Sequence, residues 1–145
     1  RSAMASGGRL AFCCWQSMRD NDWTLIPVQA ALQHQPPPEK PDPHAPAPVA
    51  FADPERLRGI LQDAGFSDVS IESHKPEMRF SESPTLAQSV REMAMIGPVS
   101  RLLADQDAEM LEKVFTSMEE ALAPYYRDGS ICLPGAIWFV TAAVD

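Results

Sequence analysis

The sequence predicts an α/β fold, because short apolar runs typical of strands alternate with stretches that carry helix caps and helical spacing. The runs lie near residues 9–15, 67–73 and 136–144, and the helix signals fall between them. A length of 145 residues, with 45% hydrophobic and 22% charged side chains, is typical of an ordinary folded domain. We therefore expect residues 1–145 to belong to a single domain.

Two of the three apolar runs predict strands that are covered on both faces. Residues 9–15 follow a pair of glycines and are nearly all apolar, and residues 136–144 show no polar alternation. Residues 67–73 differ, because Lys75-Pro76 interrupts the pattern that follows them. Since proline cannot donate to a sheet ladder, we expect an edge strand or a strand with a bulge there.

Helix starts are marked by caps that precede a proline. Asp53 suits a cap position and Pro54 suits the first helical position, while Gly65 favours the left-handed end of the same helix. Ser83-Pro84 repeats the pattern, so we expect a second helix to begin there.

Two further helices are expected from apolar spacing. Residues 23–32 resemble a short amphipathic helix, in which Pro27 is tolerated only near the first turn. Asp105 or Asp107 is expected to cap a longer helix with an apolar stripe that ends near Leu122.

A proline-rich segment separates the first predicted helix from the next. Residues 36–54 hold eight of the 14 prolines, which excludes a helix or a central strand. We expect an extended connector over residues 36–52. A docking site for a proline-reading domain is the alternative, and the absence of a flanking basic anchor disfavours it.

Charge and hydropathy exclude several classes of partner. The formal net charge is −8, so the overall field would repel the phosphates of a nucleic acid. The sequence contains no apolar run of the length that a membrane-spanning helix needs, and it starts without a signal-peptide core or an initiator Met. We expect a cytoplasmic chain that begins partway into a longer gene product.

The three cysteines do not have the spacing of a disulfide scaffold or a metal site. Cys13 and Cys14 are adjacent and should point to opposite faces of a strand, and Cys132 is remote. We expect reduced, mostly buried thiols. No metal site is expected, because there is no C-x-x-C pair and the histidines follow no ligand pattern; they are His34, His44 and His74.

Three segments resemble class I S-adenosylmethionine-dependent methyltransferases, and together they cover nearly the whole chain. Residues 6–12 (SGGRLAF) resemble the "PGGRL" entry to the fifth strand of that family, with Ser6 in place of the usual proline. Residues 53–69 resemble the helix before the sixth strand, which commonly ends in "AGF-x-x-V". Residues 138–142 (WFVTA) resemble the closing seventh strand.

This resemblance implies a partial Rossmann-like fold, the C-terminal half of the family's domain. The expected sheet is small, mixed and three-stranded, with strands near 9–15, 67–73 and 136–144, the last antiparallel and central. About four or five helices are expected to pack with it, and residues 83–126 correspond to a helical insertion that helps enclose substrate.

The family's cofactor-binding half is missing from this chain. The Gly-rich loop after the first strand and the acid that ends the second strand have no counterpart in the sequence. No cofactor-binding or catalytic residue is therefore assigned. The chain alone is expected to bind no cofactor, whereas the complete family fold uses S-adenosylmethionine.

Candidate substrate-side residues lie at the carboxyl end of the first strand, where open α/β sheets bind ligands. They are Trp15 and Gln16, with Trp23 close behind. Gln16 is suited to orienting a polar substrate group, and the two tryptophans to forming an aromatic wall. Simple packing is the alternative for the tryptophans, and we favour a solvated loop position for Gln16.

The expected function is that of a substrate-side half of a methyltransferase-like protein, inactive alone. One alternative is a non-enzymatic dimeric module that binds a small apolar ligand or a partner protein; another is a subunit of a two-chain methyltransferase. In the family, the fifth strand pairs with a fourth that is absent here. The edge of residues 9–15 is therefore expected to pair with a second copy or with an N-terminal-half chain.

Overall fold

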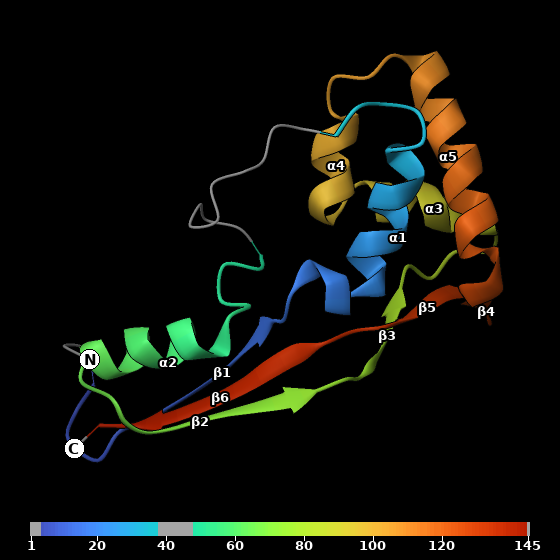
Figure 1. The fold of residues 1–145 in the computed structure, drawn as a ribbon. Coiled ribbons are helices and arrows are strands. Elements are labelled where there is room, and N and C mark those ends of the chain that lie inside the picture. Colours follow the sequence, from blue (N-terminus) through green and yellow to red (C-terminus); the bar gives the residue numbers. More distant parts are fainter. Residues whose placement is uncertain (1–3, 38–47, 145) are drawn as a thin grey trace. The chain divides into compact units, whose positions relative to one another are not determined.

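The computed structural model describes residues 4–37 and 48–144, so most of the predicted connector over 36–52 lies outside the described residues. The described chain divides into two compact units. The first holds residues 4–20, 48–76 and 136–144, and the second holds residues 21–37 and 77–135. The described residues contain five α-helices and two three-stranded sheets (Figure 1). This confirms that the fold is built from both helices and strands.

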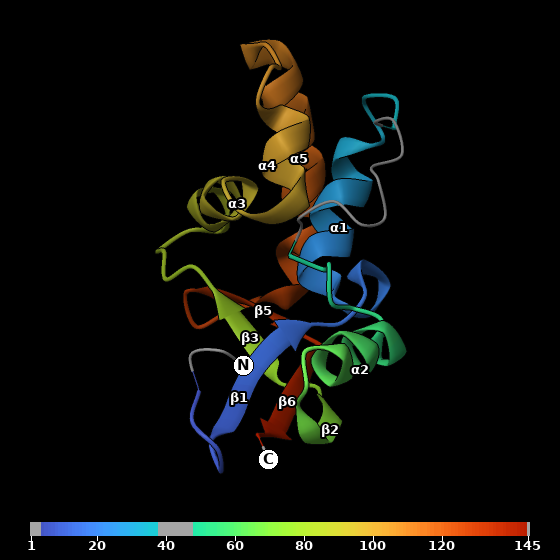
Figure 2. The same cartoon turned by 90° about the vertical axis from the view of Figure 1, so that its left-hand side faces the viewer.

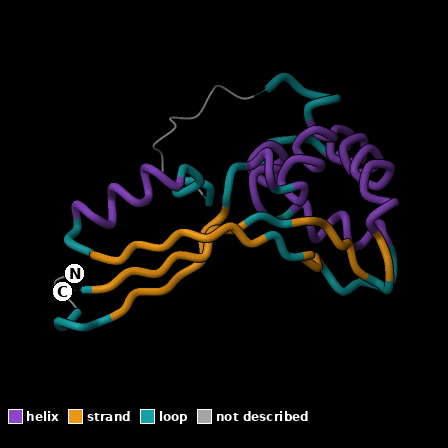
Figure 3. The backbone as a smooth tube through the Cα atoms, turned by 60° about the horizontal axis from the view of Figure 1, so that its bottom comes forward, coloured by secondary structure: helices purple, strands orange, loops and turns teal. Residues whose placement is uncertain are grey.

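The sheet of the first unit has the strands that the sequence predicts. It consists of β1 (Arg9–Trp15), β6 (Ile137–Ala143) and β2 (Ser67–His74), in the order β1-β6-β2. The prediction of a central, antiparallel last strand is confirmed, since β6 pairs antiparallel with both neighbours. The prediction of a mixed sheet is wrong: β6 separates β1 from β2, so no two neighbouring strands run parallel. Figure 3 shows the three strands side by side.

The expected irregularity of β2 is present. This strand lies at an edge of the sheet, and its register with β6 shifts between Ser67 and Ser70. Asp68 sits within the shift and has a positive φ of 49°. The strand ends at His74, directly before the Lys-Pro pair. The prediction was an edge strand or a strand with a bulge, and both are present, although the register shift lies at the end of β2 far from Pro76.

One face of this sheet packs against α2 (Pro54–Asp63). The Asp53 carboxylate caps the helix by accepting hydrogen bonds from the N–H groups of Glu55 (3.0 Å) and Arg56 (3.3 Å). The helix ends before Gly65, whose φ of +84° confirms the predicted left-handed stop. Its buried side chains Leu57 and Leu61 form an apolar core with Val140 of β6, and seven partly buried residues pack around them: Leu10, Phe12, Cys14, Phe66, Val69, Ile71 and Trp138.

The opposite face of the sheet is exposed, so the prediction of two covered faces for residues 9–15 and 136–144 is wrong. Ala11 and Cys13 of β1 are exposed, and the Phe139 side chain of β6 is 44% exposed. The prediction of mostly buried thiols fails at Cys13 for the same reason. Within the part of this unit that the structure describes, α2 is the one α-helix, and it lies on the other face.

The second unit contains a sheet that the sequence did not predict. It consists of β3 (Glu77–Phe80), β5 (Ser130–Pro134) and β4 (Tyr126–Arg127), in the antiparallel order β3-β5-β4. Strands as short as β3 and β4 carry too few residues for an alternation pattern to be recognised.

Four helices belong to the second unit, and Figure 2 shows three of them, α1, α4 and α5, close together. The four are α1 (Asp22–Ala31), α3 (Leu86–Ala94), α4 (Gly97–Leu103) and α5 (Ala108–Leu122). Two short 3-10 helices, η1 (Met18–Asp20) in the first unit and η2 (Ala123–Tyr125) in the second, complete the described elements. The range 83–126 thus contains α3, α4, α5 and η2, and its assignment as an insertion stays a prediction.

Two details of these helices differ from prediction. Pro27 lies inside α1 and beyond its first turn, in a helix that packs against α4 and α5. Packing thus overrides the local cost of proline. The cap of α3 is Thr85 and not Ser83: Thr85 Oγ1 accepts a hydrogen bond from the N–H of Gln88 at 3.2 Å. For α5, the cap is Asp107, one of the two predicted residues.

Candidate functional site

Gln16, at the carboxyl end of β1, holds the ends of three strands together. Its side chain is only 5% exposed, so the predicted solvated position is wrong. Nε2 donates to Ser73 Oγ on β2 and to the carbonyl oxygen of Ile137 on β6, both at 2.8 Å. Both hydrogens of the amide nitrogen are therefore used inside the sheet. A substrate-orienting role for Gln16 stays a prediction.

The two tryptophans belong to different units. Trp15 is the last residue of β1, half-buried, and lies opposite Ile137. Trp23 is buried in the second unit, where its ring stacks on Phe80 with centroids 5.4 Å apart. Its indole N–H donates to Asn21 Oδ1 at 3.2 Å. These contacts support the packing interpretation for Trp23, and an aromatic wall formed with Trp15 stays a prediction.

The exposed face of the first sheet is the surface that we call the open face. Side chains of one strand alternate between faces, and the pairing register aligns them in rows. One row consists of Ala11, Thr141 and Ser70, and the next of Cys13, Phe139 and Glu72. The open face is made of these six residues together with Arg9. It is largely small or apolar, and its residues come from segments far apart in the sequence.

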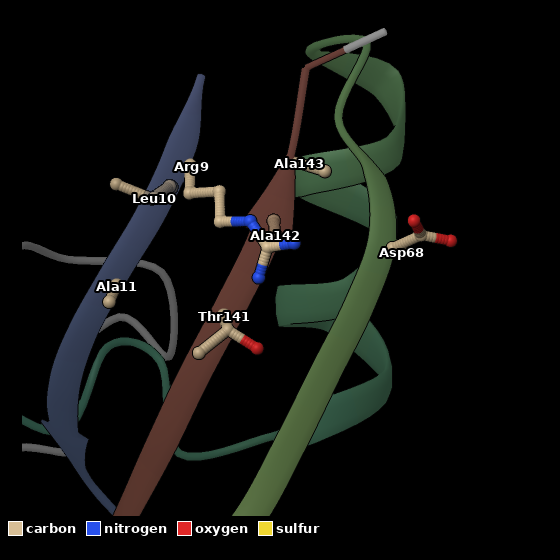
Figure 4. A pocket seen from close by; sticks show the side chains of 7 residues that line it. All are labelled: Arg9, Leu10, Ala11, Asp68, Thr141, Ala142 and Ala143. Carbon is tan, nitrogen blue, oxygen red and sulfur yellow. The ribbon is translucent and has the colours of Figure 1, made fainter. Parts of the chain in front are cut away.

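A shallow hollow of about 230 Å³ lies at one end of this sheet. Figure 4 shows the Arg9 guanidinium lying across β6, with Thr141 nearby, while the Asp68 carboxylate points away from it. Seven residues line the hollow: Arg9, Leu10, Ala11, Asp68, Thr141, Ala142 and Ala143. Its lining thus includes one cation (Arg9), one hydroxyl group (Thr141) and one carboxylate (Asp68) that points away from the other two.

The outer edge of β1 has unpaired backbone groups. The hydrogen bonds from Gln16 N to Ala136 O (3.0 Å) and from Val144 N to Gly8 O (2.9 Å) show that even-numbered residues of β1 bond to β6. In an antiparallel ladder, the odd-numbered residues then direct their N–H and C=O groups away from the partner strand. For Arg9, Ala11 and Cys13 this direction is the outer edge, beyond which the described residues place no further strand.

Cys14, the cysteine that faces α2, is poorly suited to act as a nucleophile. Burial raises the pKa of the Cys14 thiol, and the neighbouring Cys13 adds to the rise. The thiolate is the reactive form of cysteine, so a raised pKa lowers its reactivity at neutral pH. Among residues 4–37 and 48–144 there is also no group of three or more His, Cys, Asp or Glu side chains that could hold a metal ion.

Sequence reasoning missed the open face, although one signal for it is present. In β1 the larger apolar side chains, Leu10 and Phe12, are even-numbered and face α2, whereas Ala11 is small and odd-numbered. This alternation of size has the period of a strand with one covered face. An alternation of polarity is what usually reveals such a strand, and here it is absent.

Comparison with known proteins identifies no family for this chain. Neither the family models nor the curated proteins give a match to this chain. The helices of the described segments are all too short or too polar to cross a bilayer. The arrangement of the first sheet is therefore the main observation from which a function is inferred.

Proposed function

We propose that this chain is the C-terminal, substrate-side half of a methyltransferase-like protein that depends on S-adenosylmethionine, and that it is not catalytic alone. The order β1-β6-β2, with β6 central and antiparallel to both neighbours, is the observation that supports this proposal. It is the order in which the resemblance at residues 6–12, 53–69 and 138–142 arranges the fifth, seventh and sixth strands of the family.

The position of α2 also supports the proposal. The helix follows β1 and precedes β2 in the chain, and it packs on one face of the sheet through Leu57 and Leu61. This is the place of the family's helix before the sixth strand. The free edge of β1 is then the place where an N-terminal half adds its strands, and the open face is the face that the same half covers.

The residues of this chain do not fit a cofactor site. β1 ends in Trp15 and Gln16 and β2 ends in His74 before Lys75, so neither strand ends in a Gly-rich loop at a helix N-terminus. The cofactor would be held by the missing half. Residues of this chain contribute the positioning of substrate and the exclusion of water at the carboxyl end of β1.

The exposed edge and the exposed Phe139 side chain favour a second candidate, a non-enzymatic module that binds a partner protein or a small apolar ligand. In the remaining alternative the chain is a subunit of a two-chain methyltransferase, and a separate N-terminal-half chain pairs with the same edge of β1. These alternatives differ from the main proposal in what the gene encodes before Arg1.

Calorimetric titration of the purified chain with S-adenosylmethionine and with its demethylated product tests the proposal. We expect no saturable heat even at roughly millimolar ligand. Saturable binding at about micromolar affinity contradicts the proposal, because the chain would then build a complete cofactor site. Sequencing of the upstream coding region separates the main proposal from both alternatives: a Gly-rich strand-turn-helix there supports the half-domain, and its absence favours the binding module or the two-chain enzyme.

A further inference from the structure

The outer edge of β1 is self-complementary. Arg9, Ala11 and Cys13 each present a backbone N–H and a backbone C=O at this edge. The residues that alternate with them, Leu10 and Phe12, direct their backbone groups to β6. Two such edges, antiparallel to each other, exchange pairs of hydrogen bonds between their odd-numbered residues. An edge of this kind pairs with another strand unless something protects it.

We propose that, without an N-terminal half, this chain is a homodimer in which β1 pairs antiparallel with the partner's β1 about a two-fold axis at Ala11. The result is one continuous sheet of six strands, three from each copy. The inference goes beyond the methyltransferase proposal and does not rest on it, because it uses only the edge of β1. A second copy is also the simplest partner, since a two-fold axis needs one self-complementary surface.

The side chains at this edge permit the pairing. With the axis at Ala11, the two smallest side chains of the edge meet, and Arg9 lies opposite the partner's Cys13. The central row of the dimer then reads Ser70, Thr141, Ala11 in one copy and the same residues in reverse in the partner. Small side chains along the row let the two strands approach without a clash.

Charge also favours this register. Arg9 is the one charged residue of β1, and each copy carries a net charge of −8, so the pairing must not add repulsion. Arg9 lies opposite the partner's Cys13, so it is four residue steps along the strand from the partner's Arg9, and the Cα atoms of the two arginines are about 14 Å apart. This exceeds the screening length of about 8 Å at physiological salt.

Arg9 can also make a favourable contact in the dimer. In Figure 4 its side chain extends across the neighbouring strand within its own copy. In the dimer, Arg9 lies opposite the partner's Cys13, and the partner's Phe139 follows Cys13 on the adjacent strand of the same row. An Arg9 side chain extended across the axis therefore brings its guanidinium to the exposed ring of the partner's Phe139. A guanidinium over an aromatic face is attractive, and the attraction offsets part of the charge repulsion between the copies.

Disulfide trapping of the full 145-residue chain tests the register. The chain with Ala11→Cys and Cys13→Ser is expected to form a covalent dimer on mild oxidation, because paired residues of this type have Cα atoms about 5.5 Å apart. The matched control carries Thr141→Cys and Cys13→Ser. It places the new thiol on the same row but one strand inward, so the two sulfurs lie about 14 Å apart and should not link.

Sedimentation velocity on the unmodified chain tests the dimer itself. We expect a dimer at micromolar concentration and a monomer for Ala11→Pro, since proline removes an outward N–H that the isolated sheet does not use. The Ala11→Pro chain must keep its far-UV circular dichroism; if it unfolds, Ala11→Lys at the same edge takes its place. A monomeric parent chain overturns the proposal, and so does equal linking of the two cysteine variants. Neither result bears on cofactor binding.

Discussion

Gln16 and Ser73 are separated by 57 residues, yet the Gln16 side-chain amide donates to Ser73 Oγ at 2.8 Å. The same nitrogen donates to the carbonyl oxygen of Ile137 at 2.8 Å. One buried side chain thus connects the ends of β1, β2 and β6. The connection explains why a polar residue directly after an apolar strand is buried and not in solvent.

Gln16→Met is expected to lower the free energy of unfolding by about 1–3 kcal/mol, because it removes the two hydrogen bonds that the buried amide donates to Ser73 Oγ and to the Ile137 carbonyl oxygen. Urea unfolding monitored by far-UV circular dichroism measures the change. The matched control is Gln62→Met on the exposed side of α2, where we expect a change within about 0.5 kcal/mol. Equal effects of the two substitutions contradict the role given to Gln16.

Asp53→Ala is expected to destabilise the first unit by about 1 kcal/mol, since the carboxylate accepts hydrogen bonds from two otherwise unpaired N–H groups of α2. Asp63→Ala is the control, because Asp63 is an exposed carboxylate at the other end of the same helix. Its removal should be neutral or slightly stabilising, as a negative charge is unfavourable at a helix C-terminus. Thermal unfolding midpoints compare the two variants.

Gly97→Ala is expected to destabilise the second unit. The φ of Gly97 is +66°, and an added Cβ would lie 2.8 Å from Cζ3 of Trp23. The left-handed conformation alone costs about 1–2 kcal/mol for a residue with a Cβ, and the overlap with the indole adds to this. Tryptophan fluorescence during urea unfolding reports the loss.

The control for Gly97 is Gly59→Ala in α2, where a Cβ meets nothing within 4 Å. Alanine is the better helix former, so we expect this substitution to stabilise the chain by about 0.5–1 kcal/mol. The two alanine substitutions should thus act in opposite directions. A stabilising Gly97→Ala contradicts the packing of Trp23 that the structure shows.

Acid should weaken the ion pair between Glu77 of β3 and Arg127 of β4. The hydrogen bond from Arg127 lowers the pKa of the Glu77 carboxyl, and the charges of Arg127 and Arg79 act in the same direction. A lowered pKa in the folded chain means a contribution to stability that is present above the ordinary pKa of about 4.3 and is lost as the pH falls through the lowered value.

Relative to the parent chain, Glu77→Gln is therefore expected to flatten the pH dependence of stability below about pH 4.3. Unfolding midpoints measured from neutral to acid pH test this difference. Because both partners of the pair are solvent-exposed, the effect should be small and should shrink further in high salt. An effect that grows with salt contradicts the electrostatic origin.

Local chemistry explains the elements that sequence reasoning predicted correctly. Asp53, Pro54 and Gly65 act through the backbone of their own neighbours, so their effect on α2 does not depend on the rest of the fold. The long apolar run of β6 likewise marks a strand by its own composition, whereas its central place in the sheet was expected only from the family resemblance. These features belong to the sequence itself because the interactions behind them span only a few residues.

Only the tertiary structure decided the features that depend on distant partners. The segment Glu77–Phe80 carries two charges in four residues, and it becomes β3 because β5 pairs with it. Cys13 and Cys14 have the same local surroundings, yet one is exposed and the other half-buried, because α2 covers only one face of their sheet. The sequence by itself determined the bounds of α2 and the positions of the three strands of the first sheet. The second sheet, the open face and the burial of Gln16 required contacts between residues that the chain brings together only on folding.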